Sequence, residues 1–178
     1  FFFFSRLIAR HSTQMNPHFI FNAFNSILFM LLKEERTKTI HQLQLLSKLM
    51  RETLNNSENE WIILSDEVNY LRRYLEFEQV KFQHALSFDV QLPADSSEIL
   101  IPPMLIQPLL ENSIKHARLH ALEHPVIALK IDHDNTQLNV VVEDNGCGFQ
   151  PSESAVMQNG HAISMICSRL NLIWEMAG

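Results

Sequence analysis

The spacing of the apolar residues changes along this chain, and the change limits the folds that the chain can adopt. In residues 5–32, and again after residue 39, apolar side chains recur at three- and four-residue steps, as in an amphipathic helix. The segments VIALKI and LNVVVE instead alternate around DHDNTQ, as in an antiparallel β-hairpin. Helices come first and a mixed part follows, so we expect an α+β protein.

Two helices in the first part each carry an apolar face, and the polar break KEERTK separates them. One partner helix cannot cover the wide face of the first helix, so a four-helix bundle made by two copies is the economical solution. The sequence therefore predicts a helical hairpin that dimerises. The apolar positions are Met15, Phe19, Ile20, Phe24, Ile27 and Leu31 on the first helix, then Ile40, Leu43, Leu46, Met50 and Leu54 on the second.

The mixed part is expected to begin near residue 58, where NNSENE forms a polar connector. A helix is predicted with Ser65 as its N-cap, and LSFDVQLP is predicted to be a strand. Another helix follows the two prolines of IPPM, the hairpin comes next, and a last helix covers about 162–176. We therefore divide the chain into residues 1–58 and 59–178.

Composition narrows the partners and the cellular setting. The net charge is −6, from 14 Lys and Arg against 20 Asp and Glu, so we expect no direct contact with nucleic acid. Two cysteines make no disulfide framework, and no apolar run reaches the roughly 18 residues of a membrane span. The opening FFFF lacks the features of a signal peptide. We expect a cytoplasmic fragment with something apolar before residue 1.

Glycine is concentrated in one part of the chain. Residues 1–145 contain none, whereas Gly146, Gly148 and Gly160 lie within the window EDNGCGFQPSESAVMQNG. Glycine is needed where φ is positive or where the backbone closely approaches a ligand. The window follows a predicted strand and precedes a helix, so it suits a lid over a ligand. The alternative is a long surface loop whose glycines only make turns.

A second candidate segment, LIQPLLENSIKHA, is predicted to be helical. Glu111 and Lys115 lie one turn apart, as do Asn112 and His116, so one flank is polar. An amide oxygen and an ammonium group suit a magnesium-bound polyphosphate. The alternative is a solvated face with a Glu–Lys pair. Neither GxxxxGK[ST] nor GxGxxG after a strand occurs, so an ATP site here would be of another kind.

The stretch QMNPHFIFNAFNSI places His18 directly after Pro17 within a helix-forming run. Proline removes a backbone hydrogen bond and bends a helix, which would open space around the imidazole. Histidine ordinarily has a pKa near ~6.5, so much of it is uncharged and nucleophilic at neutral pH. The alternative is a kinked helix with an ordinary surface histidine. A chemical role for His18 therefore needs support from the other motifs.

Five segments together resemble the LytS-type sensor histidine kinases, the subclass marked by Asn-Pro-His-Phe. They follow the family's order across about residues 14–172: NPHFIFNAFNSI, LSKLMRETL, ILSDEVNYLRRYLEFEQVKF, IPPMLIQPLLENSIKHA and VEDNGCGF. The resemblance implies a dimerisation and phosphoacceptor region, followed by an ATP-binding α/β sandwich of the Bergerat (GHKL) type. It implies transfer of the γ-phosphate of ATP to His18, and then to an aspartate of a response regulator, of the LytTR type.

The resemblance also assigns roles around the phosphates. Asn112 would bind the Mg²⁺ that bridges the ATP phosphates, with Lys115 and His116 near those phosphates. Many histidine kinases place a carboxylate base directly after the phosphoacceptor, but Phe19 stands there. Glu111, beside Asn112, is therefore the candidate general base.

Around the purine, the resemblance implies that Asp144 accepts a hydrogen bond from the adenine amino group. A buried acceptor there selects adenine over guanine, which has a carbonyl at that place. Gly146 and Gly148 would let the backbone pass close to the purine and hinge the lid. The second glycine motif keeps Gly160 but has Ala162 where its second glycine would be, so lid closure on phosphate would be altered.

Two expectations concern the protein as a whole. The full-length protein would be anchored in the membrane upstream of residue 1, and the chain stops before the last strands that such a sandwich has. These missing strands and the altered glycine motif motivate an alternative function, a non-catalytic dimeric signalling scaffold with a degenerate ATP-binding domain.

Overall fold

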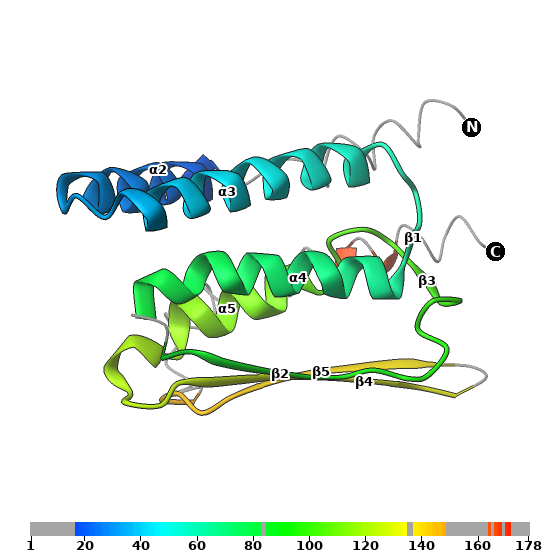
Figure 1. The fold of residues 1–178 in the computed structure, drawn as a ribbon. Coiled ribbons are helices and arrows are strands. Elements are labelled where there is room, and N and C mark those ends of the chain that lie inside the picture. Colours follow the sequence, from blue (N-terminus) through cyan, green and yellow to red (C-terminus); the bar gives the residue numbers. More distant parts are fainter. Residues whose placement is uncertain are drawn as a thin grey trace. The chain divides into compact units, whose positions relative to one another are not determined.

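The computed structural model describes residues 17–82, 85–134, 137–148, and, nearer the C-terminus, 164, 166–168 and 170–171. For Pro17 and His18 it describes only the backbone. Helices and sheets both occur, which confirms the α+β class (Figure 1).

The chain divides into two compact units. Unit 1 comprises Phe1–Lys81 with Glu98–Pro103, and unit 2 comprises Phe82–Ser97 with Met104–Gly178. This grouping follows compactness, whereas the expected boundary near residue 58 follows the order of the elements and stays a prediction.

Unit 1 contains a helical hairpin made of α2 (Pro17–Leu32) and α3 (Arg36–Ser57). The helices reverse direction at Glu34, whose φ of 60° is in the left-handed region. The Glu35 N–H donates to the Met30 carbonyl (3.1 Å), so the turn satisfies a carbonyl at the end of α2. The apolar side chains buried on these helices are Ala23, Ile27 and Met30 on α2, with Leu45, Leu46 and Leu49 on α3.

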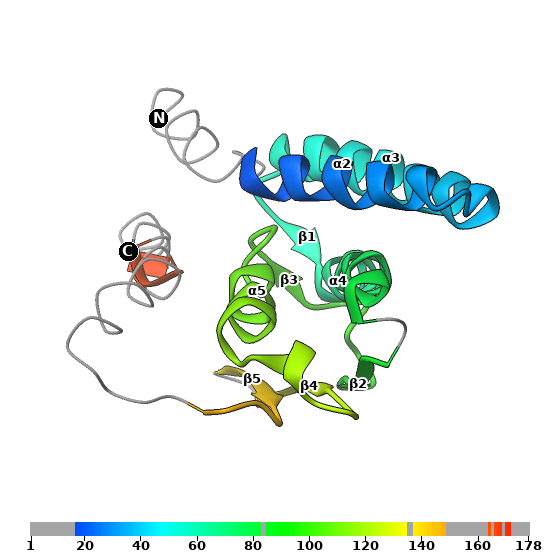
Figure 2. The same cartoon turned by 90° about the vertical axis from the view of Figure 1, so that its left-hand side faces the viewer.

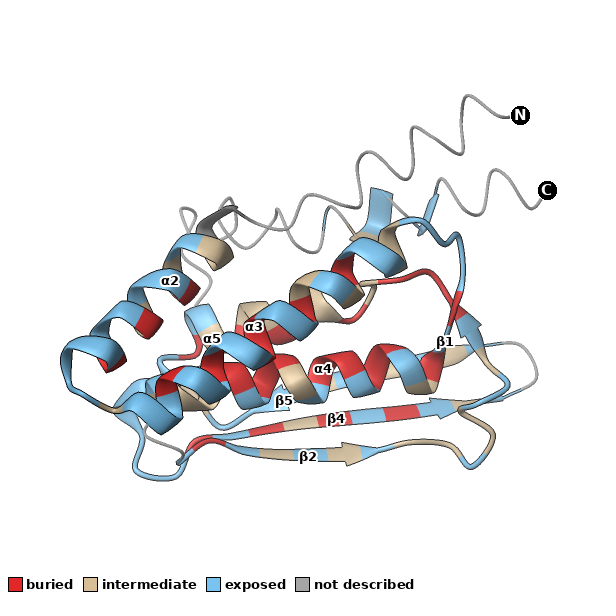
Figure 3. Cartoon of the chain, turned by 45° about the horizontal axis from the view of Figure 1, so that its top comes forward, coloured by how far each residue is buried: buried red, intermediate tan, exposed pale blue. Residues whose placement is uncertain are grey.

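Much of the predicted apolar face of this hairpin is exposed in the single chain (Figure 3). Ile27 and Leu46 are buried as expected, but most of the other predicted positions with described side chains are not. The hairpin also buries polar side chains of α3, which the apolar pattern could not indicate. The exposed large apolar residues of the hairpin are Phe21, Phe24, Leu28, Phe29, Leu31, Leu32, Ile40, Leu43 and Leu54.

The next helix of unit 1, α4 (Leu64–Gln79), begins one residue before the expected N-cap, and η1 (Val80–Phe82) follows it. Ser65 as N-cap was wrong: Ile63 occupies that position and makes no side-chain cap. The Leu64 N–H instead donates to the Ile99 carbonyl (2.8 Å). Ile99 directly precedes β3 (Leu100–Ile101), which pairs with β1 (Ile62–Ile63) in a two-stranded ribbon too short to predict from periodicity.

Unit 2 contains a three-stranded sheet in the order β2–β4–β5. β2 (Ser87–Gln91) is parallel to β4 (Val126–His133), which is antiparallel to β5 (Leu138–Asp144). Parallel neighbours require a crossover, and here it contains α5 (Gln107–His116) and η2 (Leu119–Ala121). The predicted strand, the hairpin and the helix after IPPM are therefore confirmed.

The helix α5 lies along one face of this sheet (Figures 1 and 2). Alternate residues of β4 are buried, namely Ile127, Leu129 and Ile131, and Leu110 of α5 is completely buried.

Of the expected last helix, the described residues between 164 and 171 are helical, and the rest lies outside the described part. A search of the described helices finds none long and apolar enough to cross a membrane.

Candidate functional site

The two segments singled out in the sequence meet at the C-terminal end of α5. The Cys147 N–H donates to the Ala117 carbonyl at 3.0 Å, directly after the helix. A helix leaves its last carbonyls without intrahelical partners, and here the glycine-containing loop supplies a donor. A Cβ on Gly146 would lie 2.1 Å from the Ala117 oxygen, so a side chain cannot be accommodated without movement. The close neighbour of Gly146 in this structure is the end of α5, and its predicted approach to a ligand stays a prediction.

Asn145 fixes the same loop to the start of β4. Its Oδ1 accepts a hydrogen bond from the Val126 N–H (2.8 Å), and its Nδ2 donates to the His124 carbonyl (2.8 Å). The sequence analysis missed this residue. The available signal was an asparagine directly after a strand and before a glycine, since asparagine commonly bonds to nearby backbone in turns.

Asp144 is the last residue of β5, as predicted, but its side chain is exposed, so the expectation of a buried acceptor was wrong. Asp144 is on the same face of β5 as Val140 and Val142, which are half-buried. At the end of the strand, however, the described residues no longer cover this face. Its Oδ1 accepts a hydrogen bond from the Gly146 N–H at 3.0 Å. The carboxylate is thereby oriented by the loop that contacts α5.

Gly148 needs to be glycine for a different reason. Its φ is +68°, a conformation that other residues rarely adopt, and open space surrounds the place where its Cβ would be. A side chain at this position would therefore be opposed by the positive φ and not by crowding. Gly160 and Ala162 lie outside the described part of the chain.

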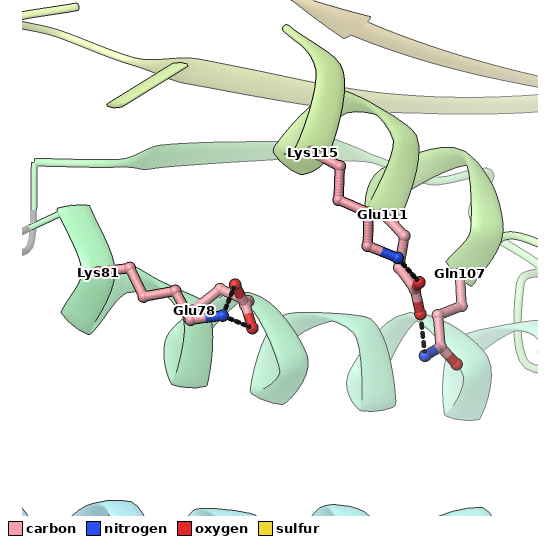
Figure 4. Close-up of polar contacts among 5 residues, drawn as sticks. All are labelled: Glu78, Lys81, Gln107, Glu111 and Lys115. Carbon is pink, nitrogen blue, oxygen red and sulfur yellow. Dashed lines mark hydrogen bonds and ion pairs between the residues drawn. The ribbon is translucent and has the colours of Figure 1, made fainter. Parts of the chain in front are cut away.

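The polar flank of α5 carries a chain of contacts (Figure 4). The Gln107 Nε2 donates to Glu111 Oε1 at 2.9 Å, and the Lys115 Nζ donates to Glu111 Oε2 at 2.7 Å. Asn112 is half-buried, whereas Lys115 and His116 are exposed in the last turn, where the helix dipole favours cations. The expected Glu–Lys pair is thus present, and an amide and an imidazole lie beside it on the helix surface.

A magnesium ion bound with a polyphosphate is compatible with this flank. Mg²⁺ usually keeps several waters and takes few protein ligands besides the phosphates, so one amide oxygen, that of Asn112, is a sufficient protein contribution. Among the residues that the structure describes, no group of three or more His, Cys, Asp or Glu side chains could hold a metal by itself. The chemistry of the flank therefore suits a metal that arrives with its phosphate ligands.

His18 lies in the first turn of α2, within unit 1, and its side chain is outside the described part. The predicted bend at Pro17 lies outside it too. The next residue, Phe19, is placed: its ring contacts those of Tyr74 and Phe77 on α4, with centroids 5.6 Å apart in both pairs. These contacts tie the start of α2 to α4. The sequence analysis missed this role, although an aromatic residue following the histidine was the available signal.

Comparisons with known proteins connect this chain to one family. The sequence model described as Histidine kinase matches residues 8–86. The chain is 36% identical over 136 residues to the Sensor protein LytS of Staphylococcus haemolyticus, covering 76% of this chain and 23% of the relative. It is 30% identical over 157 residues to the Sensor histidine kinase BtsS of Escherichia coli, covering 88% and 27%. It is also 33% identical over 138 residues to LytS of Bacillus subtilis, covering 78% and 23%.

The chain thus spans about a quarter of the length of the curated relatives it matches. The aligned part covers three quarters or more of this chain in each case. What these comparisons establish is the kind of protein, while the roles of single residues have to be argued from the site itself.

Proposed function

Because the chain belongs to the histidine kinase family and is of the LytS type, we propose that it forms the catalytic core of a two-component sensor kinase. The core would transfer the γ-phosphate of ATP to His18, and then to an aspartate of a response regulator. The observation that carries this proposal is the junction at Ala117, which puts the polar flank of α5 next to the loop after Asp144. A helix flank with an amide and a cation, beside a loop with an oriented carboxylate, suits a nucleoside polyphosphate.

The proposed adenine contact is Asp144. Adenine presents an amino group where guanine presents a carbonyl, so a carboxylate acceptor favours adenine. One oxygen of Asp144 already accepts from Gly146, but a carboxylate offers about four acceptor positions, so further bonding capacity remains. The exposure of Asp144 means that the nucleotide itself, or the lid residues beyond the described part, would have to exclude water from this contact.

The proposed phosphate contacts are Asn112, Lys115 and His116. The Asn112 oxygen would hold Mg²⁺, which when bound neutralises phosphate charge. The Lys115 ammonium would supply a point charge, and His116 a ring N–H donor. Gly160, with Gly146 and Gly148, completes the proposed nucleotide-binding set.

In the proposed transfer, an imidazole nitrogen of His18 forms a bond to the γ-phosphorus, and the bond from that phosphorus to the β–γ bridging oxygen breaks. ADP leaves, and the proton of the attacking imidazole goes to a base, for which Glu111 is our candidate. Each oxygen of Glu111 accepts from one donor and keeps a further acceptor position, and the base role is favoured when the Lys115 cation moves away. The contacts of Phe19 with α4 would hold the start of α2 in place for the transfer.

We also propose a homodimer in which α2 and α3 of two chains form a four-helix bundle. The support is the exposed apolar surface that remains on both helices after they pack together. Ile40, Leu43, Met50 and Leu54 follow one another at steps of three, seven and four residues, which places them along one line of α3, as in a bundle seam.

The remaining parts of the proposal concern the whole protein. A response regulator of the LytTR type would receive the phosphate, and membrane anchoring would come from sequence upstream of residue 1. The Bergerat-type sandwich would be completed by segments outside the described residues. These proposals on the regulator, the membrane anchor and the sandwich can be tested only with the full-length protein.

The test is phosphorylation of full-length protein with γ-labelled ATP. We expect acid-labile label on the wild type and none on His18→Gln, while both bind a non-hydrolysable ATP analogue equally. Label that persists on the variant would remove His18 from the proposal. A wild type that binds the analogue but never becomes labelled would favour the alternative function, a non-catalytic scaffold.

A further inference from the structure

The ion pair between Lys115 and Glu111 has a geometry that allows exchange. The Glu111 side chain is 17% exposed and the Lys115 side chain 41% exposed, so Lys115 reaches solvent while Glu111 is mostly covered. Such a half-exposed pair contributes little to stability. Breaking the ion pair therefore costs little free energy if the Lys115 ammonium binds another anion.

The helix places that other anion within reach. Positions 111, 112 and 115 are neighbours on an α-helix, and Lys115 falls between Glu111 and Asn112 around the helix axis. A phosphate held near Asn112 would thus lie on the side of Lys115 opposite to Glu111. The flexible four-carbon stem of a lysine allows its ammonium to turn from one to the other.

Glu111 keeps a partner when Lys115 leaves, because Gln107 donates to its other oxygen. Figure 4 shows the contrast with Glu78, both of whose oxygens are held by Lys81 at 2.8 and 2.7 Å. The Glu78 side chain is only 3% exposed, so losing Lys81 would leave a buried carboxylate without that cation. The pair of Lys115 and Glu111 can therefore open, whereas the pair of Lys81 and Glu78 stabilises the fold.

We propose that Lys115 is an exchangeable residue: without nucleotide it is held by Glu111, and the phosphates of ATP take it over. This inference rests on the proposed ATP site and adds a regulatory role for Glu111. Glu111 acts as a competitor that lowers the affinity for phosphate-containing ligands. The exchange also releases Oε2 of Glu111 only when nucleotide phosphates are present, leaving Gln107 as the residue that positions the freed carboxylate.

The experiment is a calorimetric titration of the full-length protein with a non-hydrolysable ATP analogue and Mg²⁺. Removing the competitor in Glu111→Gln should tighten binding by about two- to five-fold, the range expected for a partly exposed ion pair. Adenosine, followed by NMR titration, should bind both proteins equally because it has no phosphate. Lys115→Met should weaken binding of the analogue, and adding Glu111→Gln to Lys115→Met should then change nothing.

The matched control is Glu35→Gln, which makes the same change in net charge in unit 1, where Glu35 pairs with Lys38 at 3.3 Å. It should leave the affinity unchanged. A gain in Glu111→Gln that persists without Lys115 would mean that the carboxylate repels phosphate directly, and would overturn the exchange. If Glu111→Gln binds the analogue with unchanged affinity, the exchange is wrong but the ATP site stands. If the wild type shows no Mg²⁺-dependent binding, both the ATP site and the exchange are wrong.

Discussion

The hairpin of α2 and α3 and the helix α5 present opposite kinds of surface. The hairpin leaves large apolar side chains exposed after its own helices have packed together, among them Phe21, Leu28 and Leu43. The helix α5 buries Leu110 completely and presents a flank with a carboxylate, an amide and a cation. An unsatisfied apolar surface favours another protein surface, whereas a charged and hydrogen-bonded flank favours a polar ligand. The difference supports the proposal that the hairpin serves association and that unit 2 binds the ligand.

The largest expected effect comes from placing a charge on the apolar surface of the hairpin. Leu43→Asp should weaken dimerisation about 100-fold or more, since an unpaired charge buried at an interface costs on the order of 3–5 kcal/mol. Analytical ultracentrifugation over a concentration series measures this effect.

The matched control for that variant is Gln44→Asp, which introduces the same residue at the adjacent, exposed polar position. It should dimerise like the wild type. Equal weakening of dimerisation in both variants would point to net charge rather than to the apolar surface. If Leu43→Asp leaves dimerisation unchanged, this face is not the dimer interface.

A smaller effect is expected at the junction in unit 2. Gly146→Ala forces a Cβ toward the Ala117 carbonyl and should lower the free energy of unfolding by about 1–3 kcal/mol, as overpacking does. It should also weaken nucleotide binding, because it separates the loop from α5. Urea denaturation and calorimetry report the two effects.

Gly148→Ala is the comparison for that variant, because open space surrounds Gly148 and only its positive φ resists substitution. We expect it to destabilise less than Gly146→Ala. The reverse order would show that the contact with Ala117 is not what holds the junction.

The smallest effect is expected at the opposite end of β4, where His133 Nε2 lies 2.9 Å from both carboxylate oxygens of Asp95. The hydrogen bond that His133 donates to Asp95 raises the pKa of His133 above 6.5, helped by the Asp134 carbonyl and the charges of Asp95 and Asp132. The hydrogen bond with His133 likewise lowers the pKa of Asp95 below 3.8.

The sign of the pH dependence follows from those two directions. The histidine contribution is complete below pH 6.5 and is lost as the pH rises through the raised pKa. The aspartate contribution is complete above pH 3.8 and is lost as the pH falls through the lowered pKa. Wild type should therefore exceed His133→Gln in stability at pH 5.5 and lose that advantage by pH 9. Denaturation at the two pH values measures this difference in stability. Nucleotide affinity should not show the same pH dependence, because the pair of His133 and Asp95 lies away from the α5 junction.

The sequence predicted the elements that carry a long periodic pattern. The helices, the strand Ser87–Gln91 and the hairpin after Pro125 have enough residues for periodicity to show, and the structure contains them. The ribbon of β1 and β3 has two residues in each strand, and its effect on Leu64 depends on a carbonyl far along the chain. No local pattern could have indicated that Ile99, and not Ser65, satisfies the start of α4.

For the site, the sequence identified the types of residue but not their surroundings. The concentration of glycines pointed to Gly146 and Gly148, but only the structure separates close packing at Gly146 from positive φ at Gly148. Asp144 was expected to be buried because the strand pattern does not reveal where coverage of the strand ends. Which apolar face of α3 points inward was also undetermined, since an amphipathic stripe fits a neighbouring helix and a second chain equally well.

The most direct test of the account is calorimetry of the full-length protein with a non-hydrolysable ATP analogue, with and without Mg²⁺, in the wild type, Asn112→Ala and Asp144→Asn. If α5 and the loop after β5 form one ATP site, the wild type shows Mg²⁺-dependent binding. Asn112→Ala then loses the magnesium dependence, and Asp144→Asn binds at least ten-fold more weakly, about 1.4 kcal/mol. Both variants binding the analogue as the wild type does, with the same response to Mg²⁺, would contradict it.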